Sequence, residues 1–175
     1  MAIDKKQVAG DKGQGTKGIQ RAIITSMRIF SSAFQNNGTI PAKYTCDGEN
    51  LNPPLTISGV PNTSKSLVLI MDDPDLPSTI LNGRFTHWLI WNVPVNTLDI
   101  KEGAAPIGVE GKNSSDGTGY TGACPPKEHR YFFKLFALDT ELDLNPELVG
   151  QDDLMLAMQG HIIEQTELMG RYERP

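Results

Sequence analysis

The chain has 175 residues, a length that suits one domain with a buried core. Its formal net charge of -5 is unevenly distributed, because residues 1–30 carry six basic and two acidic side chains. The acidic remainder excludes nucleic acid as the main partner, since that affinity comes from cationic side chains on phosphates. No apolar run is long enough to span a bilayer, and the start of the chain lacks the apolar segment of a signal peptide, so we expect a cytoplasmic protein without an integral membrane segment.

The first part of the chain contains a tail and then short strands. Residues 1–21 are polar, glycine-containing and aperiodic, which predicts a disordered basic arm of undefined role. Residues 22–175 are expected to form the single domain. Residues 27–30 predict its first strand, and residues 55–57 alternate apolar with polar side chains, as a half-buried strand does.

Three later segments predict fully buried strands. Residues 66–71, 88–93 and 130–138 are apolar runs rich in β-branched and aromatic side chains, so both of their faces must be covered. Residues 93–129 form a long glycine-rich stretch in which 107–109 is the only strand candidate. A loop of that length inside a compact domain is usually functional.

The C-terminal part changes its periodicity. Asn145-Pro146-Glu147 is typical of a helix start and predicts a short helix. Apolar residues recur at helical spacing over residues 152–169, which predicts an amphipathic helix packed on the strands. The expected fold is therefore mainly β, with a C-terminal amphipathic helix.

Polar side chains stand at the ends of the three buried strands. Asp73 follows the first, His87 precedes the second and His129 precedes the third. If the first two strands are antiparallel neighbours, Asp73 and His87 converge at one rim, and His129 joins them if its strand enters from the same side. Asp73 can then hold one imidazole in a defined tautomer while the other ring nitrogen donates to the oxygen of a small anion.

Other interpretations are open for the same residues. Asp73-Pro74-Asp75 also suits a stiff capped turn, and His87 lies among aromatic residues, as a core histidine does. A nucleophile is disfavoured, since no Gly-x-Ser-x-Gly motif is present and Cys124 precedes two prolines. A metal site of two histidines and an aspartate lacks a His-x-x-x-His pair. We therefore predict no catalytic residue, metal or cofactor.

The two cysteines, Cys46 and Cys124, do not form a metal-ligand pattern. A reducing cytosol favours free thiols. Both residues lie in turn-rich loops, so whether they pair stays open.

Several segments together resemble the phosphatidylethanolamine-binding protein family, also called the Raf kinase inhibitor protein family, in its prokaryotic branch. The resemblance extends over about residues 29–173. The segments that carry it are residues 40–48, Asn52-Pro53-Pro54-Leu55, Ser58-Gly59-Val60-Pro61, Asp73-Pro74-Asp75, His87-Trp88, Gly122-Ala123-Cys124-Pro125-Pro126, His129-Arg130-Tyr131 and residues 157–161.

The resemblance implies a Greek-key sandwich of two antiparallel sheets with a C-terminal helix. It also implies a pocket for phosphate-like head groups and two cysteines that recur together. The residues that it assigns to the pocket are Asp73, Pro74, His87, Gly122, Cys124, His129 and Tyr131.

We therefore expect a non-enzymatic binding protein for a small, phosphate-bearing, phosphoethanolamine-like ligand. The rival interpretation is an inhibitor of a serine protease or a kinase that acts through exposed loops such as residues 75–78. A homodimer is compatible with the sequence.

Overall fold

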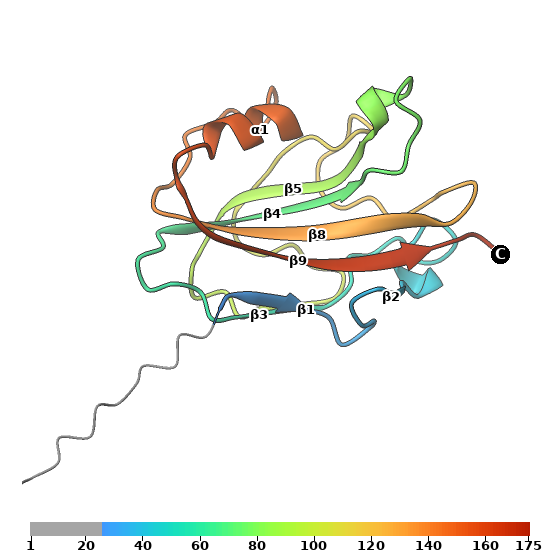
Figure 1. The fold of residues 1–175 in the computed structure, drawn as a ribbon, viewed down its shortest axis with the longest axis horizontal. Coiled ribbons are helices and arrows are strands. Elements are labelled where there is room, and N and C mark those ends of the chain that lie inside the picture. The colour runs from blue at the N-terminus through green and yellow to red at the C-terminus, as the bar shows by residue number, and fades with distance from the viewer. Residues whose placement is uncertain (1–25) are drawn as a thin grey trace, which may run out of the picture.

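The computed structural model describes residues 26–175, which form two sheets stacked face to face (Figure 1). The smaller sheet has the strand order β1-β3-β6, and the larger has the order β2-β9-β8-β4-β5-β7. The strands are β1 (Arg28–Phe30), β2 (Gly38–Thr39), β3 (Leu55–Ser58), β4 (Ser66–Asp73), β5 (Phe85–Val93), β6 (Asp99–Ile100), β7 (Val109–Glu110), β8 (His129–Leu138) and β9 (Ile162–Tyr172). Two 3-10 turns, η1 (Ala42–Tyr44) and η2 (Leu81–Gly83), and the helix α1 (Gln151–Ala157) complete the elements.

The central strand β4 is buried along its whole length because two separate cores cover its two faces. Leu67, Leu69 and Met71 face the smaller sheet and join the main core between the sheets. Val68 and Ile70 face the opposite way and pack in a second core beneath α1. This confirms the prediction, made from the apolar run, of a strand that is covered on both faces.

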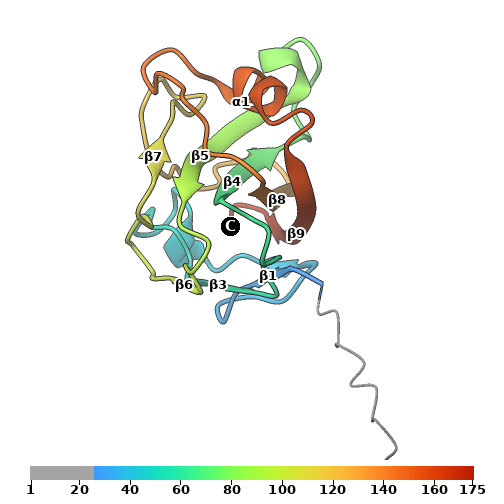
Figure 2. The same cartoon turned by 90° about the vertical axis from the view of Figure 1, so that its left-hand side faces the viewer.

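The helix α1 lies on the outer face of the larger sheet (Figure 2). A buried polar cluster holds it there. Asp72 is fully buried, and its Oδ2 accepts hydrogen bonds from Lys134 Nζ at 2.8 Å and Gln151 Nε2 at 2.7 Å. Gln151 Oε1 in turn accepts from Thr86 Oγ1 at 2.7 Å. Since Gln151 is the first residue of α1, these bonds anchor the start of the helix to β4, β5 and β8.

The expected amphipathic helix over residues 152–169 is wrong in its second half. The helix ends at Ala157, and residues 162–172 instead form β9, which pairs with β8 along its whole length. Without β9, the backbone groups on that edge of β8 would have no partners, and this requirement outweighs the helical spacing of the side chains.

Two smaller expectations also need correction. The short helix expected at Asn145-Pro146-Glu147 is a single turn, in which the Leu148 amide donates to the Asn145 carbonyl oxygen at 3.1 Å. The sheets are not wholly antiparallel either, because β2 runs parallel to β9. The two expected strands at residues 27–30 and 55–57 are present as β1 and β3.

The predicted basic arm, residues 1–21, lies outside the described residues. Between residues 26 and 175, no helix is long and apolar enough to cross a membrane.

Candidate functional site

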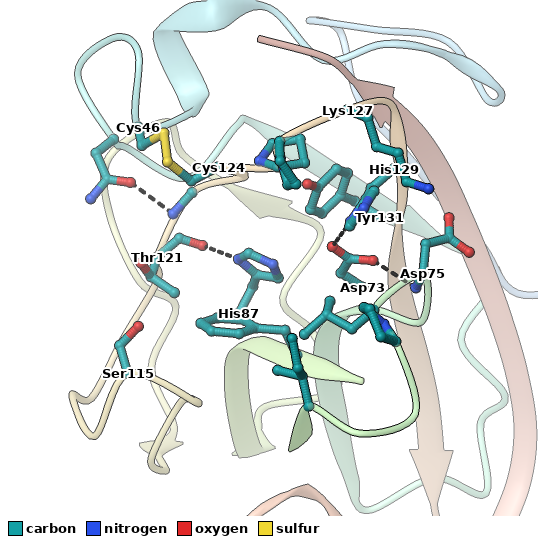
Figure 3. Close-up of a pocket in the computed structure, with 18 residues that line it drawn as sticks. Cys46, Asp73, Asp75, His87, Ser115, Thr121, Cys124, Lys127, His129 and Tyr131 are labelled. Atoms are coloured by element: carbon teal, nitrogen blue, oxygen red, sulfur yellow. Dashed lines mark hydrogen bonds and ion pairs between the residues drawn. A yellow bond between two sulfur atoms is a disulfide. The ribbon is translucent and has the colours of Figure 1, made fainter. Parts of the chain in front are cut away.

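Three strand ends meet at one rim of the larger sheet. Because β4 runs antiparallel to both β5 and β8, the end of β4 lies beside the starts of the other two strands. Asp73, His87 and His129 therefore converge, as the sequence predicts (Figure 3). Tyr131 is two residues after His129 on β8, so strand alternation places both side chains on the same inner face.

His87 reaches the inner face through a β-bulge. Met71 pairs with Trp88 and Asp72 pairs with Thr86, so His87 is an extra residue on β5 at this point of the ladder. Trp88 already belongs to the inner core, and regular alternation would send His87 outward. The bulge lets both side chains face inward, which is the way bulges commonly redirect a side chain beside a site.

The converging side chains form the floor of a cavity of about 810 Å³. Its polar residues include Asp73, His87, His129 and Tyr131, with the exposed cation Lys127 at the edge. The surrounding wall is largely apolar, and it is formed by Leu76, Pro77, Ile80, Phe85, Pro125 and Pro126.

Asp73 orients His129. Its Oδ2 lies 2.7 Å from His129 Nδ1, and only 4% and 5% of the two side chains are exposed. Its Oδ1 accepts from the Asp75 amide at 2.8 Å. Its two carboxylate oxygens therefore position an imidazole and the loop that follows β4.

His87 is held in a similar way by a backbone carbonyl. Its Nδ1 lies 2.7 Å from the Thr121 carbonyl oxygen, which only accepts, so Nδ1 carries a proton. The ring packs against Phe85 and Tyr131, with centroids 4.6 Å and 5.2 Å away. Burial lowers the pKa of His87 below its ordinary value of 6.5, and the bond to Thr121 opposes this shift only in part.

Both imidazoles therefore use Nδ1 for anchoring and leave Nε2 for a ligand. A neutral ring presents a lone pair at Nε2, whereas an imidazolium presents a donor. Tyr131 adds a hydroxyl group that keeps its proton, because burial and then the nearby Asp73 charge raise its pKa. The Tyr131 hydroxyl can therefore donate to an anion at any ordinary pH, whereas each imidazole donates from Nε2 only when it is protonated and otherwise accepts a proton that the anion carries.

An ion pair fixes the loop between β4 and β5 beside β8. Arg130 donates to Asp75 from Nε and from its amide, both at 2.9 Å to Oδ2. The Arg130 guanidinium lowers the pKa of the Asp75 carboxyl, so this residue stays ionised and paired. The pair holds the start of the apolar wall, which begins at Leu76.

A disulfide closes the other side of the cavity. Cys46 and Cys124 are bonded to each other, and both line the cavity, so the structure forms the pair that the sequence left open. It also means that Cys124 has no thiolate with which to act as a nucleophile. Gly122 lines the same side of the cavity, and its amide donates to Asn50 Oδ1 at 2.7 Å.

Six of the seven residues assigned to the pocket line this cavity. Pro74 does not, because the following residues, Asp75 to Pro77, form that wall. Further lining residues were not predicted as site residues: Cys46, Asn50, Ser115, Thr121 and Lys127, together with the apolar wall. Thr121 acts through its backbone carbonyl, which no side-chain pattern reveals. Within residues 26–175, no group of three histidine, cysteine or acidic side chains gathers closely enough to hold a metal ion.

Comparison with known sequences identifies relatives of this arrangement. Residues 30–173 match the family model described as phosphatidylethanolamine-binding protein. A UPF0098 protein of Methanothermobacter thermautotrophicus is 47% identical over 155 residues, which cover 85% of this chain and 99% of the relative. A UPF0098 protein of Chlamydia pneumoniae is also 47% identical, over 150 residues and with the same two coverages.

Solved structures give the same result. A putative phosphatidylethanolamine-binding protein homologue from Chlamydia trachomatis superposes with a TM-score of 0.82 at 41% identity, covering 86% of this chain and 99% of that one. E. coli YbcL, described as a new member of the mammalian family, superposes with a TM-score of 0.78 at 27% identity, covering 86% and 100%. This chain therefore belongs to the phosphatidylethanolamine-binding protein family.

Proposed function

We propose that this protein is a non-enzymatic binding protein that captures a small phosphate-bearing ligand, of the phosphoethanolamine type, in the cavity lined by Asp73, His87, His129 and Tyr131. The observation that carries the proposal is the pair of buried imidazoles, each anchored through Nδ1. Two ring nitrogens and a tyrosine hydroxyl then remain to meet the oxygens of one tetrahedral anion.

The apolar wall supports a ligand with an organic substituent. Inorganic phosphate would contact only the polar floor. A phosphate monoester could extend its organic group along Leu76, Ile80 and Phe85, which line the cavity above that floor. Burial of apolar surface there contributes roughly 25 cal/mol for each Å² removed from water.

The hydrogen bonds of the two histidines favour binding over catalysis. An activated nucleophile needs a hydroxyl or thiol hydrogen-bonded to a base. Across residues 26–175, the partners of the His87 and His129 rings are a carbonyl oxygen and a carboxylate. Cys124 is tied in the disulfide.

Calorimetric titration with phosphoethanolamine tests the proposal. His87→Asn can keep a hydrogen bond to Thr121 but removes Nε2, so we expect at least a tenfold loss of affinity, about 1.4 kcal/mol. The matched control is His161→Asn, since His161 is exposed and bonds to Asp139 away from the cavity. Equal affinity in the wild type and both variants contradicts the proposal.

Proton uptake provides a second test. At about pH 8 a phosphate monoester is a dianion, because its second pKa is about 6. A neutral His87 must then gain a proton to donate from Nε2, so binding should take up protons from the buffer. Titrations in buffers of different ionisation enthalpy measure this uptake. An absence of uptake rules out the imidazolium mechanism, as does an affinity that stays flat as the pH rises through about 6 to 7.

Inhibition of a serine protease or kinase is the alternative function. The observation that favours it is the loop that includes η2, where Ile80 and Leu81 are about half exposed. Leu81 also has a φ of 46°, a conformation that a leucine keeps only when its surroundings impose it. Leu81→Asp should abolish inhibition of a target protease and leave phosphoethanolamine binding unchanged, whereas His87→Asn should do the reverse.

The cytoplasmic location and the homodimer stay predictions. Sedimentation analysis of the full chain measures directly whether it forms a homodimer.

A further inference from the structure

The disulfide at the cavity rim is accessible to solvent. Both Cys46 and Cys124 are exposed residues, although they also line the cavity (Figure 3). They are 78 residues apart in the sequence, so the bond joins two otherwise distant segments. An exposed disulfide can be attacked by a thiolate from solution, whereas a buried one is protected.

The two joined segments are residues 44–50 and 120–126. Apart from the disulfide, hydrogen bonds and the packing of Tyr44 and Ala123 in the main core hold them together. The Cys46 amide donates to the Ala123 carbonyl oxygen at 3.0 Å, and Tyr120 Oη donates to the Tyr44 carbonyl oxygen at 2.8 Å. The Gly122 amide bonds to Asn50. These contacts can keep the segments near each other without the disulfide, but the disulfide is the covalent link between them.

The segment 120–126 also carries the carbonyl that anchors His87. Thr121 lies three residues before Cys124, and its oxygen is the acceptor for His87 Nδ1 at 2.7 Å. The Thr121 amide also donates to the His87 carbonyl oxygen at 3.0 Å. Movement of this segment must therefore break or distort both bonds, which shifts the imidazole and exposes a ring that is now buried.

We propose that the Cys46–Cys124 disulfide is redox-active and that its reduction weakens ligand binding by releasing Thr121 from His87. This inference rests on the proposed function of the cavity. The reductant is a dithiol. One of its thiolates attacks a sulfur atom of the disulfide, which releases one cysteine and forms a mixed disulfide with the other. The second thiol of the reductant then attacks the mixed disulfide and releases the remaining cysteine. Two electrons and two protons pass to the cysteines, which become thiols, and the dithiol becomes a cyclic disulfide.

The coupling is reciprocal. If reduction lowers the affinity by some factor, bound ligand makes the disulfide harder to reduce by the same factor. In a reducing compartment the low-affinity thiol form prevails, and in an oxidising one the high-affinity disulfide form prevails. The redox state of the surroundings would thus decide whether the protein holds its ligand.

The test compares the full chain before and after reduction by excess dithiothreitol, with thiol alkylation and mass measurement to count the free cysteines. Calorimetry with phosphoethanolamine should show a loss of affinity of about fivefold or more on reduction. The double variant Cys46→Ser/Cys124→Ser should match the reduced wild type and should not respond to dithiothreitol.

A second readout needs no ligand. The pH titration of the His87 ring, followed by NMR, should shift toward the ordinary histidine pKa on reduction, because the ring becomes more exposed. The His161 ring is the internal control and should titrate identically in both states.

The outcomes separate this inference from the proposed function. A shifted His87 titration with no phosphoethanolamine binding in either state refutes the proposed function and supports the redox coupling. An unchanged His87 titration overturns the inference, even if the affinity changes. A disulfide that resists dithiothreitol, or a chain that loses its dispersed NMR spectrum on reduction, also overturns it, since the bond is then purely structural.

Discussion

Gly122 stands where two backbone segments approach too closely for a side chain. A Cβ atom added there would lie 2.6 Å from Asn50 Oδ1, 2.7 Å from the Tyr44 carbonyl oxygen and 2.8 Å from Thr45 Cα. Two of these three atoms belong to the backbone and cannot rotate away. Gly122→Ala must therefore push residues 120–126 off residues 44–50.

The cost follows from two contributions. Overpacking of a tight site destabilises by roughly 1–3 kcal/mol. Loss of the bond from the Gly122 amide to Asn50 adds about 1 kcal/mol. We expect Gly122→Ala to lower the free energy of unfolding by about 2–4 kcal/mol and to weaken phosphoethanolamine binding, since Thr121 moves with its neighbour.

Urea denaturation of the wild type and two variants measures this cost. Gly117→Ala is the matched control, because Gly117 belongs to the same loop region and an added Cβ would meet only the Asn113 side chain, at 3.6 Å or more. Its free energy of unfolding should stay within about 0.5 kcal/mol of the wild type. If Gly122→Ala is as stable as Gly117→Ala, the close approach of the two segments is refuted.

Three further predictions concern the same site. Asp73→Ala leaves His129 Nδ1 buried without its acceptor and should cost about 1–3 kcal/mol in urea denaturation. A free energy of unfolding that does not change would mean that the pair is not buried as described. Burial lowers the pKa of His87, so this residue binds a proton at a higher pH in the unfolded chain than in the folded chain. The free energy of unfolding should therefore decline as the pH falls below about 6.5, and His87→Asn should show less of this decline. Replacing both Cys46 and Cys124 with serine removes a link across 78 residues and should lower the free energy of unfolding by about 4 kcal/mol, with an unchanged denaturant midpoint as the contradicting result.

The convergence of Asp73 and His129 could be predicted from the sequence once antiparallel pairing was assumed, because it depends on where each strand ends, whereas Tyr131 was assigned to the pocket by the family resemblance. Each residue stands at or near the end of a strand whose apolar composition marks it as buried. Alternation along β8 then places His129 and Tyr131 on one face. Antiparallel pairing of β4 with β8 brings Asp73 to the same rim, and this pairing, which the sequence analysis assumed, is present in the structure.

The orientation of His87 could not be predicted in this way. Its neighbour Trp88 belongs to the inner core, so alternation alone would turn His87 to the other face. The β-bulge opposite Met71 and Asp72 exists only in the paired sheet. Its anchor, the Thr121 carbonyl, lies 34 residues away in the sequence and belongs to the backbone.

The C-terminal segment shows the same limit. Residues 162–169 have apolar side chains at helical spacing, yet they form β9. They form a strand because β8 would otherwise have an unpaired edge, where the backbone N–H and C=O groups of ten residues need hydrogen-bond partners. That requirement belongs to the sheet and has no counterpart in the local sequence of β9.

The sequence by itself determined the buried strands, the strand ends at which the polar residues stand and the residue types that the cavity would offer, because composition and alternation act over a few neighbouring residues. Only the tertiary structure decided the bulge at His87, the conversion of the expected helix into β9 and the disulfide between Cys46 and Cys124. Each of these depends on a contact between segments that are far apart in the chain, where backbone pairing and close approach outweigh local preference.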